Sequence, residues 1–218
     1  MSNIRPKMCY NILESTDSTG DKMKTYTMND VRRAVDIAFD MFGDKIRKGD
    51  GTPYIGHLFR VLGIVQEGGG SCRAQVGAML HDVLEDIDGG EDIIRQNFGE
   101  DMVELVRECS DTEVRPKPSW KERKVAHIAH IEHASDDALR ILLADKIDNG
   151  RSLCVLANYA DLKNFNATPH EQAWYFHSVS AVMSSAATDI RGVSYQVDEL
   201  SDIAEELADL VDYVPTTE

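Results

Sequence analysis

The chain has 218 residues, of which 42% are hydrophobic and 28% charged, and its formal net charge is −15 at pH 7. This length and composition are ordinary for one large globular domain with a full core. The negative charge would repel nucleic-acid backbones and anionic membranes, and no apolar run approaches the roughly 20 residues needed to span a bilayer, so we expect neither kind of partner.

The first half of the chain predicts a flexible arm followed by helices. Residues 1–26 carry no sustained periodicity, whereas from Thr27, a plausible N-cap, apolar residues recur at three- and four-residue spacing. Thr52-Pro53 has the form of a cap and first-turn proline that open a second helix, and three glycines at 68–70 end it. A third helix over about 71–87 and two shorter ones over 90–109 follow.

The second half predicts further helices with explicit start signals. The segments at 119–122 and 168–171 have the form of capping boxes, which predict helices at about 120–134 and 169–189. Residues 138–156 between them form a strongly apolar helical segment, and 195–213 form an acidic amphipathic helix. No run of alternating β-branched residues occurs, so the fold class is all-α, a compact bundle of about eight to ten helices.

The segment from Ala78 to Asp86 places reactive groups in an otherwise apolar helical pattern. On a helical wheel His81, Asp82, Glu85 and Asp86 fall within roughly 140° of one another. The His-Asp pair suits a divalent cation, and the Glu-Asp pair one turn later suits the handling of a water molecule. A solvated acidic face with one histidine is the alternative.

Two further residues suit a metal site. His57 lies near the start of the second predicted helix, and Asp145 interrupts the most hydrophobic segment. Each alone is more often structural, but with His81 and Asp82 they would provide two imidazoles and two carboxylates. Such a mixed nitrogen and oxygen site suits Mn²⁺, Fe²⁺ or Zn²⁺.

Three segments carry a resemblance to a known family. RKGDGTPYIGH at 47–57, HDVLED at 81–86 and DKIDNGRSL at 145–153 resemble, in order and spacing, the hydrolase domains of RelA/SpoT-type alarmone enzymes, which are HD-type metal-dependent phosphohydrolases. Over roughly residues 28–185 the chain is most similar to the single-domain small alarmone hydrolases.

The resemblance implies a reaction and a division of roles. The substrate would be guanosine 5′-diphosphate or 5′-triphosphate carrying a 3′-diphosphate, the alarmone of the stringent response, and the reaction would remove the 3′-pyrophosphate. Mn²⁺ would be held by His57, His81, Asp82 and Asp145. Glu85 and Asp86 would handle the attacking water, with Glu85 favoured as the base and Asp86 as its partner.

An acidic protein that binds so anionic a ligand needs local basic groups. Arg47 and Lys48 precede the His57 helix, Lys146 directly follows Asp145, and Asn149 lies one turn past it. Aromatic side chains near the start of the helix at 169–189 offer a ring to stack on the base, although such residues are more often core. The candidate substrate-binding residues are Arg47, Lys48, Asn149, Lys146, Arg151 and Tyr175.

The residue pattern and the resemblance together predict a domain organisation. Residues 1–26 would form the arm, 27–190 the HD hydrolase domain, and 191–218 an acidic helix and tail packed on the domain or a partner.

The four cysteines are widely spaced with no CxxC and no signal peptide, which favours free thiols and a cytoplasmic location. Monomer and homo-oligomer both remain open.

The sequence departs from the family pattern at three positions. Ile87 stands where threonine is usual, Asp148 replaces an aromatic residue or histidine, and Gly150 replaces a larger apolar residue. None is an expected metal ligand, but Asp148 and Gly150 could reshape the nucleotide pocket. Another phosphorylated nucleotide, such as an adenosine alarmone or the 2′-phosphate of NADPH, therefore remains an alternative substrate. A non-catalytic nucleotide sensor and a purely structural helical protein are the alternatives to an enzyme.

Overall fold

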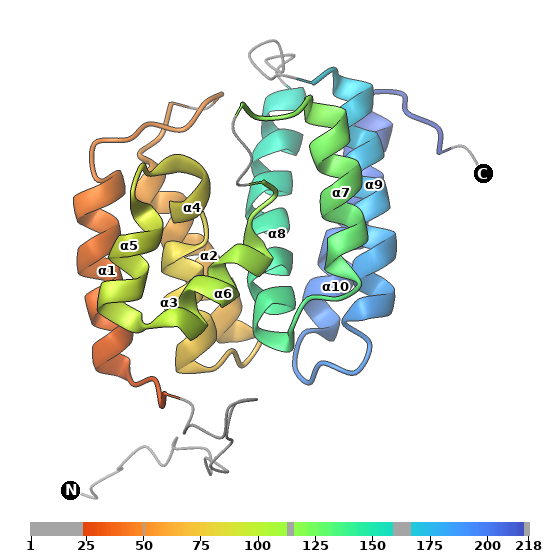
Figure 1. Cartoon of the computed structure of the whole chain (residues 1–218). Coiled ribbons are helices and arrows are strands. Elements are labelled where there is room, and N and C mark those ends of the chain that lie inside the picture. Colours follow the sequence, from red (N-terminus) through yellow and green to blue (C-terminus); the bar gives the residue numbers. More distant parts are fainter. Residues whose placement is uncertain (1–23, 50, 113–115, 159–166, 216–218) are drawn as a thin grey trace, which may run out of the picture.

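The computed structural model describes residues 24–49, 51–112, 116–158 and 167–215. This part of the chain contains helices and, apart from one isolated bridge between Ile46 and Pro53, no β-structure, which confirms the all-α prediction (Figure 1). The helices are α1 Met28–Phe42, α2 Tyr54–Glu67, α3 Cys72–Leu80, α4 Val83–Asp86, α5 Gly90–Phe98, α6 Glu100–Cys109, α7 Trp120–Ile131, α8 Asp136–Asn158, α9 Pro169–Ala186 and α10 Ser194–Leu210.

Helix α8 lies at the centre of the bundle. It packs against α2, α3 and α6 on one side and against α9 and α10 on the other (Figure 1). The reason is its composition, because consecutive residues from Ile141 to Ala144 are all buried and a helix that is apolar on all sides must be covered on all sides. Asp145 follows this run, so the central position of α8 carries a carboxylate into the middle of the protein.

The predicted start signals position the outer helices. The Asp30 carboxylate accepts a hydrogen bond from the backbone N–H of Thr27 at 2.9 Å, and complete capping boxes join Ser119 to Glu122 and Thr168 to Glu171. The second helix begins one residue later than predicted, since Pro53 itself occupies the N-cap position and the first helical residue is Tyr54.

The single helix predicted over 71–87 is wrong, because the chain forms α3 and α4 with His81 and Asp82 between them. The Ala78 carbonyl, which would accept from the Asp82 backbone N–H in a continuous helix, instead accepts from the His81 ring at 2.8 Å. Asp82 has φ −91° and ψ −1°, a sparsely populated conformation in which many active-site residues occur. The break therefore turns both side chains toward the bundle centre.

The last helix belongs to the packed body. Helix α10 lies along α8 and α9, and Gly150 of α8 makes the approach possible. A Cβ atom on Gly150 would lie 2.4 Å from Cγ2 of Ile203 and 2.8 Å from Cε1 of Phe176. The small residue at this position thus serves helix packing.

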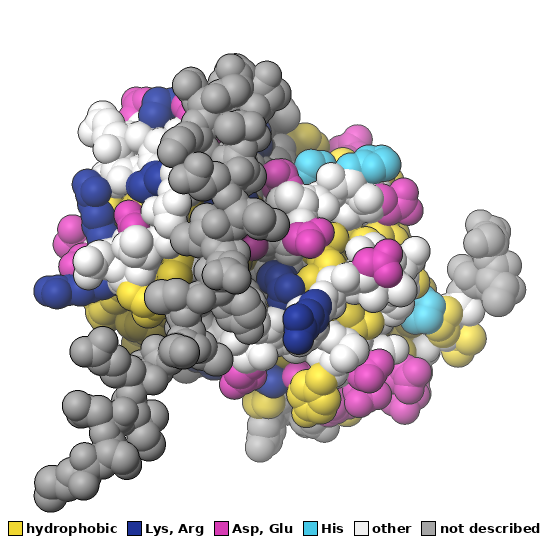
Figure 2. Space-filling model, turned by 90° about the horizontal axis from the view of Figure 1, so that it is seen from below, with side chains coloured by type: hydrophobic (Ala, Val, Ile, Leu, Met, Phe, Trp, Pro, Cys, Tyr) yellow, Lys and Arg dark blue, Asp and Glu magenta, His cyan; other side chains and the backbone are white. Residues whose placement is uncertain are grey.

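The predicted arm over 1–26 falls largely outside the described residues. At its end Tyr26 is buried, and its hydroxyl donates to the Phe98 carbonyl at 3.1 Å. The visible side chains on the face in Figure 2 mix basic, acidic and hydrophobic groups without one continuous basic tract. Among the described residues no helix is both long and apolar enough to cross a membrane.

Candidate metal centre and adjoining basic cavity

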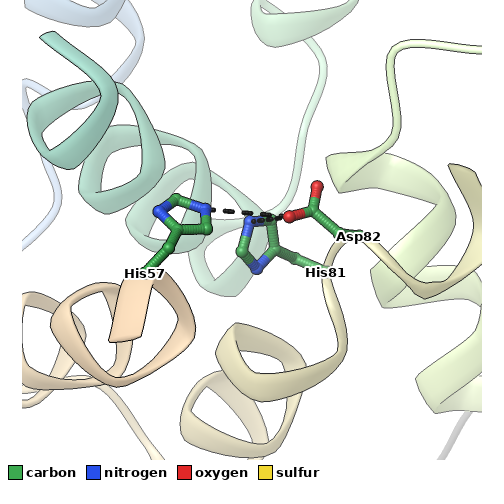
Figure 3. A group of neighbouring side chains, drawn as sticks. All are labelled: His57, His81 and Asp82. Atoms are coloured by element: carbon green, nitrogen blue, oxygen red, sulfur yellow. Dashed lines mark ion pairs between the residues drawn. The ribbon is translucent and has the colours of Figure 1, made fainter. Parts of the chain in front are cut away.

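Three of the predicted ligands meet in the interior. His57 comes from α2, and His81 and Asp82 come from the break between α3 and α4, with one ligand atom of each within 4.8 Å of the others (Figure 3). The Asp82 carboxylate oxygen Oδ2 lies 3.2 Å from Nε2 of His81 and 3.7 Å from Nε2 of His57. Figure 3 shows both rings directed toward this carboxylate.

The fourth predicted ligand approaches the same two nitrogens from α8. Asp145 Oδ1 lies 3.3 Å from Nε2 of His57 and 3.6 Å from Nε2 of His81. The structure therefore brings together all four residues expected to bind a cation, from three separate parts of the chain. Two imidazoles and two carboxylates form a donor set that suits borderline divalent metals.

Hydrogen bonds orient both imidazoles with Nε2 toward the two carboxylates. The Nδ1–H of His81 donates to the Ala78 carbonyl at 2.8 Å, and that of His57 donates to Asp148 Oδ2 at 2.7 Å. A neutral ring held in this way presents the lone pair of Nε2. His81 Nε2 is fully buried and has no hydrogen-bond partner among the described residues, which fits an atom that ligates a cation.

The electrostatics favour positive charge at this point. Burial lowers the pKa of the His81 ring, but the negative charges of Asp82 and Asp145 outweigh burial and leave the pKa well above its usual value. Burial likewise opposes ionisation of Asp145, yet the Lys146 ammonium and the two imidazoles hold the pKa of this carboxyl well below its usual value. The carboxylates thus stay ionised and attract a proton or a metal ion to the space between them.

Tyr54 supports the centre and was missed by the sequence analysis. Its hydroxyl donates a hydrogen bond to Asp82 Oδ2, and its ring lies edge-on to His57 with the centroids 5.5 Å apart. Tyr54 precedes His57 by three residues and so lies on the same face of α2. The three-residue spacing between Tyr54 and His57 is the sequence feature that predicts a Tyr54 side chain near the metal ligands.

Glu85 and Asp86 occupy different surroundings. Glu85 lines the cavity that contains the ligand group, and its Oε1 accepts from the backbone N–H of Asp111 at 2.8 Å. Burial, with the nearby charges of Asp111 and Asp82, raises the pKa of Glu85 to about 7. Asp86 instead forms an ion pair with Lys45 at 2.5 Å and is not among the residues that line this cavity.

Two adjoining cavities share basic residues. The cavity at the ligand group has a volume of about 150 Å³, and the neighbouring cavity about 170 Å³. Both are lined by Arg47, Lys124, Lys146 and Asn149. The second cavity adds Lys48 and the rings of Trp120, Tyr175 and Phe176. This arrangement provides the local positive charge that an anionic ligand needs in an acidic protein, and rings beside it.

The remaining predicted binding residues fall in three situations. Lys146 is buried and pairs with Asp145 at 2.6 Å, and Asn149 donates to the same carboxylate at 2.5 Å. Tyr175 is buried with its ring edge-on to Trp120 at 5.9 Å. Arg151 is not brought to either cavity, since it pairs with Glu199 of α10 and its side chain is 47% exposed.

Comparison with known proteins agrees with this geometry. The HD domain family matches residues 34–172. The human protein named guanosine-3′,5′-bis(diphosphate) 3′-pyrophosphohydrolase MESH1 is 32% identical over 73% of this chain and 82% of its own length, and its mouse counterpart is 30% identical over 80% and 90%. The MESH1 of Xenopus tropicalis is 38% identical, but the match spans 47% of this chain and only 56% of the frog protein.

Two solved structures share the fold of this chain. A metazoan orthologue of SpoT, described as hydrolysing ppGpp, superposes with a TM-score of 0.65 and 27% identity over 84% of this chain and 98% of its own. A Listeria monocytogenes protein at 24% identity shares the fold, with a TM-score of 0.58 over 74% of this chain and 98% of its own. The chain belongs to the HD domain family and, within it, to the family of the MESH1 proteins.

Proposed function

We propose that this protein hydrolyses the 3′-pyrophosphate of guanosine 3′,5′-bis(diphosphate) or its 5′-triphosphate analogue, releasing pyrophosphate and GDP or GTP. The observation that carries the proposal is the juxtaposition of the ligand group with a cavity lined by four basic side chains and three aromatic rings. The MESH1 relatives, of which the mouse protein is matched over 90% of its length, bear the name of this activity.

A divalent cation fits the ligand group, and we propose Mn²⁺. His57, His81, Asp82 and Asp145 would hold it, and the orphaned, buried Nε2 of His81 supports this assignment. When bound, the cation supplies Lewis-acid chemistry that acidifies water and offsets negative charge on phosphate oxygen.

Glu85 is the proposed general base. It lines the same cavity as the ligands, and a carboxyl pKa of about 7 suits proton transfer near neutral pH. In the proposed step the water oxygen bonds to the phosphorus attached to the 3′ oxygen, the bond between that phosphorus and the 3′ oxygen breaks, and Glu85 takes a proton from the water. The released 3′ oxygen takes up a proton and pyrophosphate departs. Asp86 would act indirectly, by holding Lys45.

Arg47, Lys48, Lys124 and Lys146 would neutralise substrate phosphates, and Asn149 would orient them from α8. Trp120 and Tyr175 offer ring surfaces to the purine base. Arg151 contributes at most through its ion pair with α10.

A substrate panel tests the proposal. Protein loaded with Mn²⁺ is incubated with the guanosine tetra- and pentaphosphates, an adenosine alarmone and NADPH, and the products are resolved by anion-exchange chromatography. We expect pyrophosphate and GDP or GTP from the guanosine alarmones, and no product with His57→Ala. Consumption of another nucleotide while the guanosine alarmones stay intact would assign the alternative substrate class. Binding without any turnover would identify a sensor.

We also propose the cytoplasm as the site of action and a free nucleotide, not a nucleic acid, as the ligand. Cys109 is a buried free thiol, and the formal charge of −15 opposes a polyanionic partner. Cell fractionation and a nucleic-acid binding assay check these two statements.

A further inference from the structure

Asp148 is a buried carboxylate for which the catalytic scheme gives no role. It lies in α8 one turn after Asp145, and it is only 2% exposed. Its carboxylate accepts hydrogen bonds from three side chains of other segments. His57 Nδ1 donates to Oδ2 at 2.7 Å, Arg47 Nη1 donates to the same oxygen at 2.8 Å, and Arg60 Nε donates to Oδ1.

Arg47 connects this carboxylate to the basic cavity. Its guanidinium makes two bonds to adjacent residues of α8, from Nη1 to Asp148 and from Nη2 to Asn149 Oδ1 at 2.7 Å. Asn149 in turn donates to Asp145 Oδ1 at 2.5 Å. Arg47 lines both cavities. Hydrogen bonds connect it to two proposed metal ligands, to His57 through Asp148 and to Asp145 through Asn149.

We infer that Asp148 is a positioning residue with two tasks: it fixes the imidazole of His57 with Nε2 toward the metal, and it holds Arg47 in place at the phosphate-binding cavity. A carboxylate that accepts the second N–H of a ligating histidine fixes the ring orientation and strengthens its basicity. The second task, though not the first, depends on the proposed function.

Asp148 departs from the pattern of the segments that this chain resembles. In the hydrolase segments that it resembles, the residue before the asparagine is commonly aromatic or histidine, and neither would offer Arg47 and Arg60 a carboxylate. The buried charge is compensated by the two guanidinium groups and the imidazole, as a buried carboxylate requires.

Titration with Mn²⁺ alone, by calorimetry and without substrate, tests the first task. Asp148→Asn keeps the shape but removes the charge, and we expect metal affinity to fall by about 10- to 100-fold. Asp137→Asn is the matched control, because Asp137 lies on the same helix and pairs with Arg73 at 3.2 Å, outside both cavities. Its metal affinity should equal that of the unaltered protein. An unchanged affinity in Asp148→Asn, even with lowered thermal stability, would overturn the inference.

Steady-state kinetics at saturating Mn²⁺ tests the second task. Arg47→Gln should raise KM without weakening metal binding, whereas Asp148→Asn should raise KM and weaken metal binding. Because both changes disturb the same guanidinium, the double variant should have a KM close to that of the worse single variant. If the increase in KM of the double variant equals the product of the two single increases, Arg47 and Asp148 act independently, which would contradict the proposal that Asp148 holds Arg47. If the unaltered protein shows no turnover of guanosine alarmones, the proposed function fails while the metal titration still decides the first task.

A measurement on the unaltered protein covers the case in which Asp148→Asn does not fold. With ¹⁵N-labelled histidine and diamagnetic Zn²⁺, the nitrogen spectrum reports which ring nitrogen of His57 carries the proton, and the signal missing in His57→Gln assigns it. We expect the proton on Nδ1, the nitrogen that faces Asp148. A proton on Nε2 would overturn the inference.

Discussion

Replacing Glu85 by Gln should stabilise the metal-free protein while abolishing turnover. Burial and the charges of Asp111 and Asp82 raise the pKa of this carboxyl from 4.5 to about 7. Each tenfold change in an acid dissociation constant corresponds to about 1.36 kcal/mol, so holding Glu85 ionised in the folded state costs about 3 kcal/mol. Gln has nearly the same shape and carries no charge, and its amide oxygen can still accept from the Asp111 N–H.

The sign of the pH dependence follows from the raised pKa. Between pH 4.5 and about 7 the folded state keeps a proton on Glu85 that the unfolded chain has lost. The contribution of Glu85 to stability is therefore fully present below pH 4.5 and is lost as the pH rises through about 7. The advantage of Gln should thus be about 2 to 3 kcal/mol larger at pH 8 than at pH 5.

Urea unfolding with a metal chelator, at pH 5, 6.5 and 8, measures this difference. Comparing two pH values removes any constant effect of the substitution on packing. Glu104→Gln is the control, because Glu104 is an exposed residue of α6 outside the cavity. A Glu85→Gln effect that is equal at pH 5 and pH 8 would show that the carboxyl has an ordinary pKa, and the argument for it as a base matched to neutral pH would fail.

Three further outcomes are expected. His81→Ala should abolish the binding of one Mn²⁺ per chain, measured by elemental analysis after gel filtration, because the substitution removes the ligand atom Nε2 and no other described side chain replaces it. Retained stoichiometric metal would refute the ligand assignment. Free Mn²⁺ at 100 times its Kd should raise the free energy of unfolding by about 2.7 kcal/mol, and His81→Ala should remove this gain; a gain that persists would place the metal elsewhere. Gly150→Ala should destabilise the fold by about 1 to 3 kcal/mol, because the added Cβ would lie 2.4 Å from Cγ2 of Ile203. The control Gly63→Ala places its Cβ in open space and should be neutral or stabilising. Equal effects of the two substitutions in urea unfolding would contradict the close packing of α10 on α8.

The sequence identified the four ligand candidates because each is a polar group in an apolar helical pattern. His57, His81, Asp82 and Asp145 would be costly to bury without partners, so their presence at core positions predicted a shared site. Their convergence at distances of 3.2 to 3.7 Å agrees with that reasoning. The starts of α1, α7 and α9 were predictable for a similar reason, since the residues of a capping box act within four positions of one another.

Residues whose role depends on distant partners were not predictable in this way. Asp86 and Arg151 lie close in sequence to functional residues, but the fold pairs them with Lys45 and Glu199 at the surface. Tyr54 and Asp148, in contrast, contact the ligands themselves. Spacing along a helix indicates which face a side chain occupies, but it does not show what lies opposite that face.

The sequence by itself determined the all-α class, the positions of most helices and the kind of chemistry, because capping, periodicity and buried polar groups are local properties of the chain. Only the tertiary structure decided that the helix predicted over 71–87 breaks at His81 and Asp82, that Glu85 lines the cavity and Asp86 does not, and that Asp148 joins His57 to Arg47. The physical reason is that hydrogen bonds and the burial of charge depend on α2, α3 and α8 coming together, and residues 91 or more positions apart meet only after folding.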